Sequence, residues 1–176
     1  KSDELIKKIK TGRFLIMESK LIKGLIDQYN FEVESGYIYY SMANYVKDKG
    51  MDGFAHFFDK QAEEEFEHAE KLRQFLFAID VRPDLEGIKK PETEFGTFTE
   101  TFKTALEHEK EVTKRINNLY DLSVKENDHR VTSLLQWYVD EQVEEEDHFR
   151  GLIERLERIN ESWSGLYIFD AELGRR

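Results

Sequence analysis

The feature of this sequence that most restricts its fold is the helical spacing of apolar residues over four long stretches. Apolar side chains recur every three or four positions, as they do on the buried face of an α-helix. A glycine turn at "KDKGMDG" and a proline-containing segment separate some of these stretches. Helices are therefore expected over about 19–47, 53–80, 97–126 and 129–159, followed by a short apolar fifth helix over about 164–174.

The connections between these helices predict how they are arranged. The links after the first and third helices are short, so each of those pairs is expected to be an antiparallel hairpin. The link between the second and third helices contains both prolines, Pro83 and Pro91, and its length of about 17 residues is too great for a simple bundle turn. Extended at about 3.3 Å per residue, it spans about 56 Å, whereas a helix of about 28 residues measures about 42 Å. The sequence thus predicts an all-α four-helix bundle with a long crossover connection and a short C-terminal fifth helix.

The composition limits the classes of partner. A formal net charge of −11 argues against nucleic acid or an anionic membrane and favours cations. The chain has no cysteine, which excludes disulfides, zinc knuckles and iron–sulfur clusters and is compatible with the cytoplasmic location that we expect. The sequence contains no run of about 18 apolar residues, which is the length that a membrane-spanning helix needs. Residues 1–17 are basic and weakly amphipathic, and are expected to be an N-terminal extension or a remnant of expression ahead of a domain over 18–176.

Each apolar stripe is interrupted near its middle by polar residues. These are Glu32 in the first helix, Glu65 and His68 in the second, Glu109 in the third, and Gln142 and Glu145 in the fourth. In both halves of the chain, the polar residues of the second helix follow the acid of the first by 33 and 36 positions. The strings "DKQAEEE" and "DEQVEEE" match better at an offset of 81 than of 77, but only the offset of 77 keeps every interruption on its stripe. The chain is therefore interpreted as two related hairpins.

The energetic cost of burying these acids predicts bound cations. A single glutamate on an apolar stripe is most often a half-buried member of an ion pair, or a sign that the stripe is wrongly drawn. Four uncompensated carboxylates in one core, however, cost several kcal/mol each, which rivals a whole domain's stability of about 5–15 kcal/mol. No core position of the stripes is Lys or Arg, so protonation or metal ions must neutralise the charge, and two divalent cations balance it. Oxygen-rich ligation with one imidazole favours iron or manganese over zinc and calcium.

These residues resemble the ferritin-like di-iron proteins, in which two helices each give a Glu and the other two each give Glu-x-x-His. The first half matches fully, whereas the second half has Gln142-x-x-Glu145. Phe66 follows Glu65, where haem-binding bacterioferritins carry methionine, so no haem is expected. The segments "NFEVESGYIYYSMANY", "GFAHFFDKQAEEEFEHA", "VTKRIN" and "LQWYVDEQVEEED" look like those of the haem-free bacterial and archaeal ferritins, and the similarity runs over about 17–173.

The resemblance implies a role for each site residue. A first iron would be held by Glu32, Glu65 and His68, and a second by Glu65, Glu109 and Glu145, with Gln142 nearby. A third, weaker iron position would involve three further acids: Glu64, Glu141 and Glu144. Tyr39 and Trp137 match aromatic residues beside the centre, where they would be either ordinary core residues or sources of electrons. His148 is expected at the surface, although Glu145-x-x-His148 also spells the ligand pattern.

The function implied by the resemblance is iron storage by a ferroxidase. Such a protein oxidises Fe(II) with dioxygen or peroxide and keeps the ferric mineral inside a hollow homo-oligomeric shell of twenty-four subunits. The apolar tail "WSGLYIFDAEL" is expected to pack in an interface. Two alternatives remain at this stage: a rubrerythrin-like di-iron peroxidase or oxidase, which usually carries an additional glutamate and often a cysteine-bound iron, and a metal-free acidic helical adaptor.

Overall fold

The computed structural model describes residues 19–175, and all the regular elements in that range are helices. The expected N-terminal extension over 1–17 lies outside the described residues. The helices are α2 (Lys20–Asp48), α3 (Asp52–Ala78), α4 (Phe98–Lys125), α5 (His129–Ile159) and α6 (Trp163–Leu173). They agree with the four long helices and the short fifth helix that the apolar spacing predicts. Within the described part of the chain, none of the helices has the length and apolar character of a membrane span.

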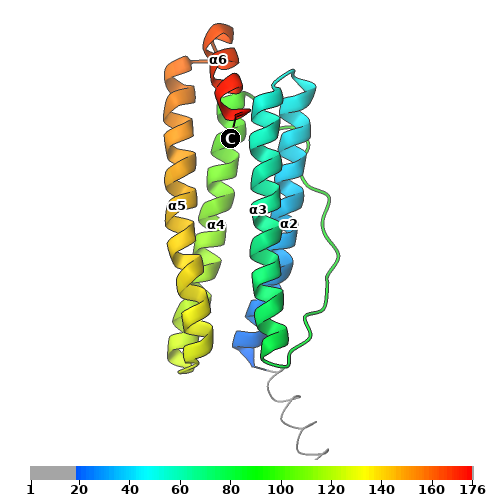
Figure 1. Cartoon of the computed structure of the whole chain (residues 1–176), viewed down its shortest axis with the longest axis vertical. Coiled ribbons are helices and arrows are strands. Elements are labelled where there is room, and N and C mark those ends of the chain that lie inside the picture. Colours follow the sequence, from blue (N-terminus) through cyan, green and yellow to red (C-terminus); the bar gives the residue numbers. More distant parts are fainter. Residues whose placement is uncertain (1–18, 176) are drawn as a thin grey trace, which may run out of the picture.

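The long helices form a four-helix bundle of two hairpins, α2 with α3 and α4 with α5 (Figure 1). The segment between α3 and α4 runs along the outside of the bundle from one end to the other, so α3 and α4 are parallel, as predicted. Asn30 of α2 holds this segment at two points, because its side chain donates to the Asp84 carbonyl at 3.0 Å and accepts from the Glu86 amide at 2.8 Å. The crossover is therefore fixed directly to the helix that carries Glu32.

Helix α6 packs against α3 and α5 at one end of the bundle. One of its side chains caps the N-terminus of α3. No side chain of the preceding residue caps α3, but the Asp170 carboxylate of α6 accepts from the Phe54 amide at 2.8 Å. An acid at a helix N-terminus also interacts favourably with the helix dipole. The contact requires glycine at position 53, because a Cβ there would lie 1.8 Å from the Asp170 carbonyl oxygen.

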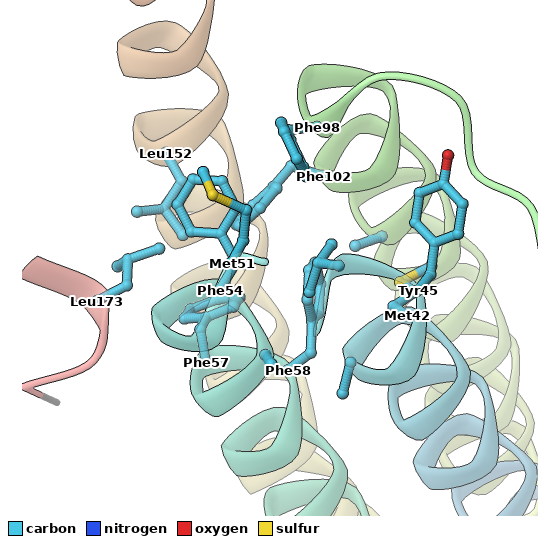
Figure 2. Close-up of a cluster of buried hydrophobic side chains, with 14 of the residues drawn as sticks. Met42, Tyr45, Met51, Phe54, Phe57, Phe58, Phe98, Phe102, Leu152 and Leu173 are labelled. Carbon is cyan, nitrogen blue, oxygen red and sulfur yellow. The ribbon is translucent and has the colours of Figure 1, made fainter. Parts of the chain in front are cut away.

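The apolar core consists of two clusters at opposite ends of the bundle. Figure 2 shows part of the first cluster, in which aromatic and aliphatic side chains from α2, α3, α4 and α5 meet, among them Met42, Phe58, Phe102 and Leu152. The second cluster lies at the other end of the bundle, where α2 and α5 begin and α3 and α4 end. Every long helix passes from one cluster to the other, and the polar interruptions of all four stripes lie between the two. The fold thus creates a polar layer across the middle of an apolar core.

Candidate metal centre

The polar layer is buried from solvent. The exposed fraction of its residues is 0% for Glu32 and Glu109, 1% for Glu65, 3% for Gln142, 6% for His68 and 7% for Glu145. Their helices hold them there because each lies on the same face as the apolar residues one turn before and after it. The predicted inward orientation of these six side chains is confirmed.

Three of these side chains form a compact ligand cluster. One ligand atom each of Glu32, Glu65 and His68 lies within 4.8 Å of the others, and His68 Nδ1 is 3.5 Å from Glu65 Oε2. The Oε2 atoms of Glu32 and Glu65 have no hydrogen-bond partner among the described residues. Buried carboxylate oxygens are normally satisfied, and two unsatisfied oxygens beside an imidazole fit a metal ion that accepts oxygen and nitrogen ligands.

The remaining acids of the layer, Glu109 and Glu145, are held by hydrogen bonds instead. Glu109 accepts from the Tyr39 hydroxyl and, at 3.0 Å, from Gln142 Nε2. Glu145 accepts from Gln61 Nε2 at 3.0 Å. The structure therefore brings three of the predicted ligands together. The other two acids, Glu109 and Glu145, lie in the same layer but accept hydrogen bonds from protein donors.

The acids affect one another electrostatically. Burial raises the pKa of Glu32 and Glu65 well above the usual value, and the charges of Glu65 and Glu109, respectively, raise these pKa values further. Burial also raises the pKa of Glu109 to about 7, although the hydrogen bond from Tyr39 opposes this. The pKa of Glu145 is likewise raised to about 7, by burial and then by Glu109. The layer thus holds protons near neutral pH that a cation would displace.

Two buried glutamines of the site were not predicted from the sequence. Gln28 and Gln61 are both fully buried, and each donates to one of the acids. Each lies four positions before an acid, Glu32 and Glu65 respectively, and therefore on the same helix face. This spacing of four could have indicated that the two glutamines face the polar layer. The apolar stripes alone, however, do not show whether a glutamine side chain is buried or exposed.

Tyr39 and Trp137 lie beside the polar layer, as predicted. The Tyr39 ring is stacked between Phe58 and Phe149, with centroids 6.2 and 6.1 Å away. Burial raises the pKa of the Tyr39 phenol well above its usual value, so the hydroxyl stays protonated and serves as a donor. The half-buried Trp137 meets the His68 ring at 5.4 Å in an edge-on arrangement.

The three acids predicted to form a third iron position are only partly brought together. Glu64 and Glu141 are half-buried and line a cavity of about 350 Å³ together with His68 and Trp137. Glu144 is exposed and does not line that cavity. The cavity nevertheless connects the surface to the imidazole of the compact cluster.

His148 is not the surface residue that the sequence suggested. It is half-buried, and its ring meets that of Phe57 at 5.5 Å and lies next to Phe149. Its position one turn beyond Glu145 places it on the side of the first apolar cluster. The imidazole therefore packs against aromatic residues.

Comparison with known proteins agrees with this architecture. The family model of the ferritin-like domain matches residues 22–159. A bacterial non-heme ferritin of Staphylococcus haemolyticus is 37% identical over 161 residues, which cover 92% of this chain and 97% of that protein. The solved open-pore ferritin of the archaeon Archaeoglobus fulgidus superposes with a TM-score of 0.89 at 36% identity, covering 91% of this chain and 99% of its own. A humanized archaeal ferritin gives a TM-score of 0.88 at 39% identity, covering 89% and 96%. The chain therefore belongs to the ferritin family.

Proposed function

We propose that the protein stores iron, and that it oxidises Fe(II) to Fe(III) in the buried polar layer before the ferric product is deposited in a hollow shell of identical subunits. The observation that carries the proposal is the cluster of Glu32, Glu65 and His68, whose ligand atoms lie within 4.8 Å of one another in a buried site. Two of its carboxylate oxygens have no hydrogen-bond partner among the described residues. Because the ferritin family stores iron, we infer that the cation is iron.

Charge balance supports two iron ions in each subunit. Four buried glutamates carry up to four negative charges, and the buried polar residues among those described include no Lys or Arg. Two Fe(II) ions neutralise that charge. The first iron would be held by Glu32, Glu65 and His68. The second would be held by Glu109 and Glu145, with Glu65 shared between the two ions and Gln142 beside Glu109.

The proposed reaction uses the two ions together. Each Fe(II) gives one electron to a single dioxygen molecule, which takes up two protons and leaves as hydrogen peroxide, so superoxide is bypassed. Anionic carboxylate oxygens stabilise Fe(III) relative to Fe(II), because they interact more strongly with the higher charge. A site with one imidazole and the neutral Gln142 would hold Fe(III) less firmly than a site with a second histidine, which suits a product that must move on.

Features outside the centre also support storage. Helix α6 buries Leu166, Phe169 and Leu173 against its own bundle but exposes Trp163, Tyr167 and Ile168 by 57, 57 and 73%. An exposed apolar face of this kind suits an interface between subunits. The net charge of −11 favours the accumulation of cations, and the cavity beside His68 gives Fe(II) a route to the centre.

The direct test is aerobic addition of Fe(II), followed through the absorbance of ferric iron, together with the mass of the particle from light scattering. We expect a shell that accumulates many ferric ions per subunit. Replacing Glu65 with alanine removes the ligand that both ions share and should slow oxidation by at least about 100-fold. The matched control is Glu63→Ala on the same helix, where the side chain is exposed and pairs with Lys60.

The alternatives predict different results. A metal-free adaptor would bind no iron and would oxidise Fe(II) equally slowly with and without Glu65. A rubrerythrin-like enzyme would keep its ferric pair in place and turn over peroxide without building a mineral. Either outcome, or a stable monomer by light scattering, would contradict the storage proposal.

A further inference from the structure

A chain of two hydrogen bonds connects the outside of the bundle to the compact cluster. Nε of Arg115 on α4 donates to Oε1 of Gln28 on α2 at 2.9 Å. Nε2 of Gln28 donates in turn to Oε1 of Glu32 at 2.8 Å. Gln28 is fully buried and Arg115 is half-buried. The polar layer is therefore linked, through Gln28, to the positively charged side chain of Arg115, which lies outside the layer.

The chemistry of the three groups fixes the direction of this chain. A guanidinium has only donors, the ionised carboxylate that binds a metal has only acceptors, and an amide has an NH₂ group that donates and an oxygen that accepts. With Arg115 on one side and Glu32 on the other, the Gln28 amide has a single orientation that satisfies both neighbours. The reverse orientation would place its oxygen against the carboxylate and its NH₂ group against the guanidinium. Oε1 of Glu32 thus accepts the bond from Gln28, and Oε2 is the oxygen left without a hydrogen-bond partner among the described residues.

Arg115 is itself held in place by α2. Its guanidinium carbon lies 4.1 Å from the centroid of the Phe31 ring, and Nη2 donates to the Asp27 carbonyl at 3.4 Å. Stacking and hydrogen bonding restrict a guanidinium far more than a lysine ammonium could be restricted at the same place. Two cavities flank this side chain: one of about 480 Å³ between α2 and the crossover segment, and one of about 190 Å³ between α2 and α4.

We propose that Gln28 and Arg115 are positioning residues for the metal centre. Arg115 sets the orientation of the Gln28 amide, and the amide occupies Oε1 of Glu32, so that Oε2 is presented toward Glu65 and His68. The inference deepens the proposed function and rests on it. It assigns the ligand geometry of the first iron partly to a residue on the outer side of the bundle.

The test is an anaerobic titration of the assembled protein with Co(II), which is not oxidised by the centre and whose visible absorption bands report its ligands. Gln28→Leu removes both bonds at nearly constant volume, and Arg115→Met removes only the outer one. Loss of a residue that orients a metal ligand typically costs 10–100-fold in metal affinity. We expect a loss of about that size for one of two Co(II) ions in Gln28→Leu, with altered bands, and a smaller loss in Arg115→Met.

The double variant separates this relay from a general effect of charge. If Arg115 acts through Gln28, removing both should weaken Co(II) binding no more than Gln28→Leu alone. Lys114→Met is the matched control, because it removes one positive charge from the neighbouring exposed position of α4 and should leave affinity and bands unchanged. Gln28→Glu provides a second polar variant that keeps an acceptor for Arg115 but removes the donor to Glu32, and it should weaken binding as Gln28→Leu does.

The results that would overturn the relay are specific. Equal Co(II) affinity and bands in wild type and Gln28→Leu would do so, as would additive losses in the double variant or a loss of the same size in Lys114→Met. In those cases a wild type that still binds two Co(II) ions per subunit leaves the proposed function intact. A wild type that binds no Co(II) would overturn both the relay and the proposed function.

Discussion

Replacing Glu145 with glutamine should stabilise the metal-free protein, because the carboxylate is buried without a cation. The pKa of Glu145 is raised from 4.5 to about 7, first by burial and then by the charge of Glu109. A tenfold change in proton affinity is worth about 1.4 kcal/mol, so ionised Glu145 lowers the free energy of unfolding by about 3 kcal/mol above pH 7. Glutamine removes this cost, and its oxygen can still accept the hydrogen bond from Gln61.

The sign of the effect depends on pH. Below pH 4.5 the carboxyl is protonated in both the folded and unfolded states, and it costs nothing. Between pH 4.5 and about 7 the unfolded state loses its proton first, so the stability of the wild type falls as pH rises. The stabilisation by Glu145→Gln should therefore be less than about 1 kcal/mol at pH 5 and close to its full value of about 3 kcal/mol at pH 8.

Thermal unfolding of the metal-free shell, at one protein concentration and at both pH values, measures this difference. For a chain of this length about 3 kcal/mol corresponds to an increase in Tm of about 6–12 °C. The control Glu144→Gln changes the same group at an exposed neighbouring position and should shift Tm little at either pH. A lower Tm for Glu145→Gln at pH 8, or a shift of the same size at pH 5 as at pH 8, would show that the buried charge of Glu145 does not destabilise the metal-free protein.

Three further predictions concern other parts of the molecule. Metal binding should release more protons at pH 6 than at pH 9 in a pH-stat experiment, because Glu109 and Glu145 have pKa values of about 7 and are protonated only at the lower pH. Gly53→Ala should lower Tm by several degrees, since its Cβ would lie 1.8 Å from a backbone oxygen of α6, whereas Gly151→Ala, whose Cβ would point into open space, should not lower it. Tyr39→Phe should slow Fe(II) oxidation by about tenfold in stopped-flow measurements, because it removes a hydroxyl that orients a carboxylate; a rate equal to that of the wild type would argue for a purely apolar role.

The bundle and its inward-facing acids could be predicted from the sequence because apolar spacing alone determines which face of a helix is buried. Stepping by three and four positions along each stripe reached residues that are all buried, with one exception, Tyr120 at the end of α4. There Leu119 is buried and Tyr120 is half exposed, since steps of three and four follow the true helical repeat only approximately. The crossover was predicted from length, which does not depend on side-chain detail.

The arrangement within the polar layer could not be predicted in the same way. Spacing places a carboxylate on a face but does not give its rotamer, which depends on donors from other helices. Tyr39 and Gln61 hold Glu109 and Glu145 in this structure, while Glu32 and Glu65 keep an oxygen without a hydrogen-bond partner among the described residues. The hydrogen bond from Arg115 to Gln28 joins α4 to α2. The apolar pattern of one helix does not show which residues of another helix it will contact.

The most direct test of a buried iron centre is the anomalous scattering of iron in crystals soaked anaerobically with Fe(II). We expect two iron peaks per chain in the polar layer, one against Glu32, Glu65 and His68 and the other against Glu65, Glu109 and Glu145. Iron found only on exposed acids, with the polar layer empty at saturating Fe(II), would contradict this expectation.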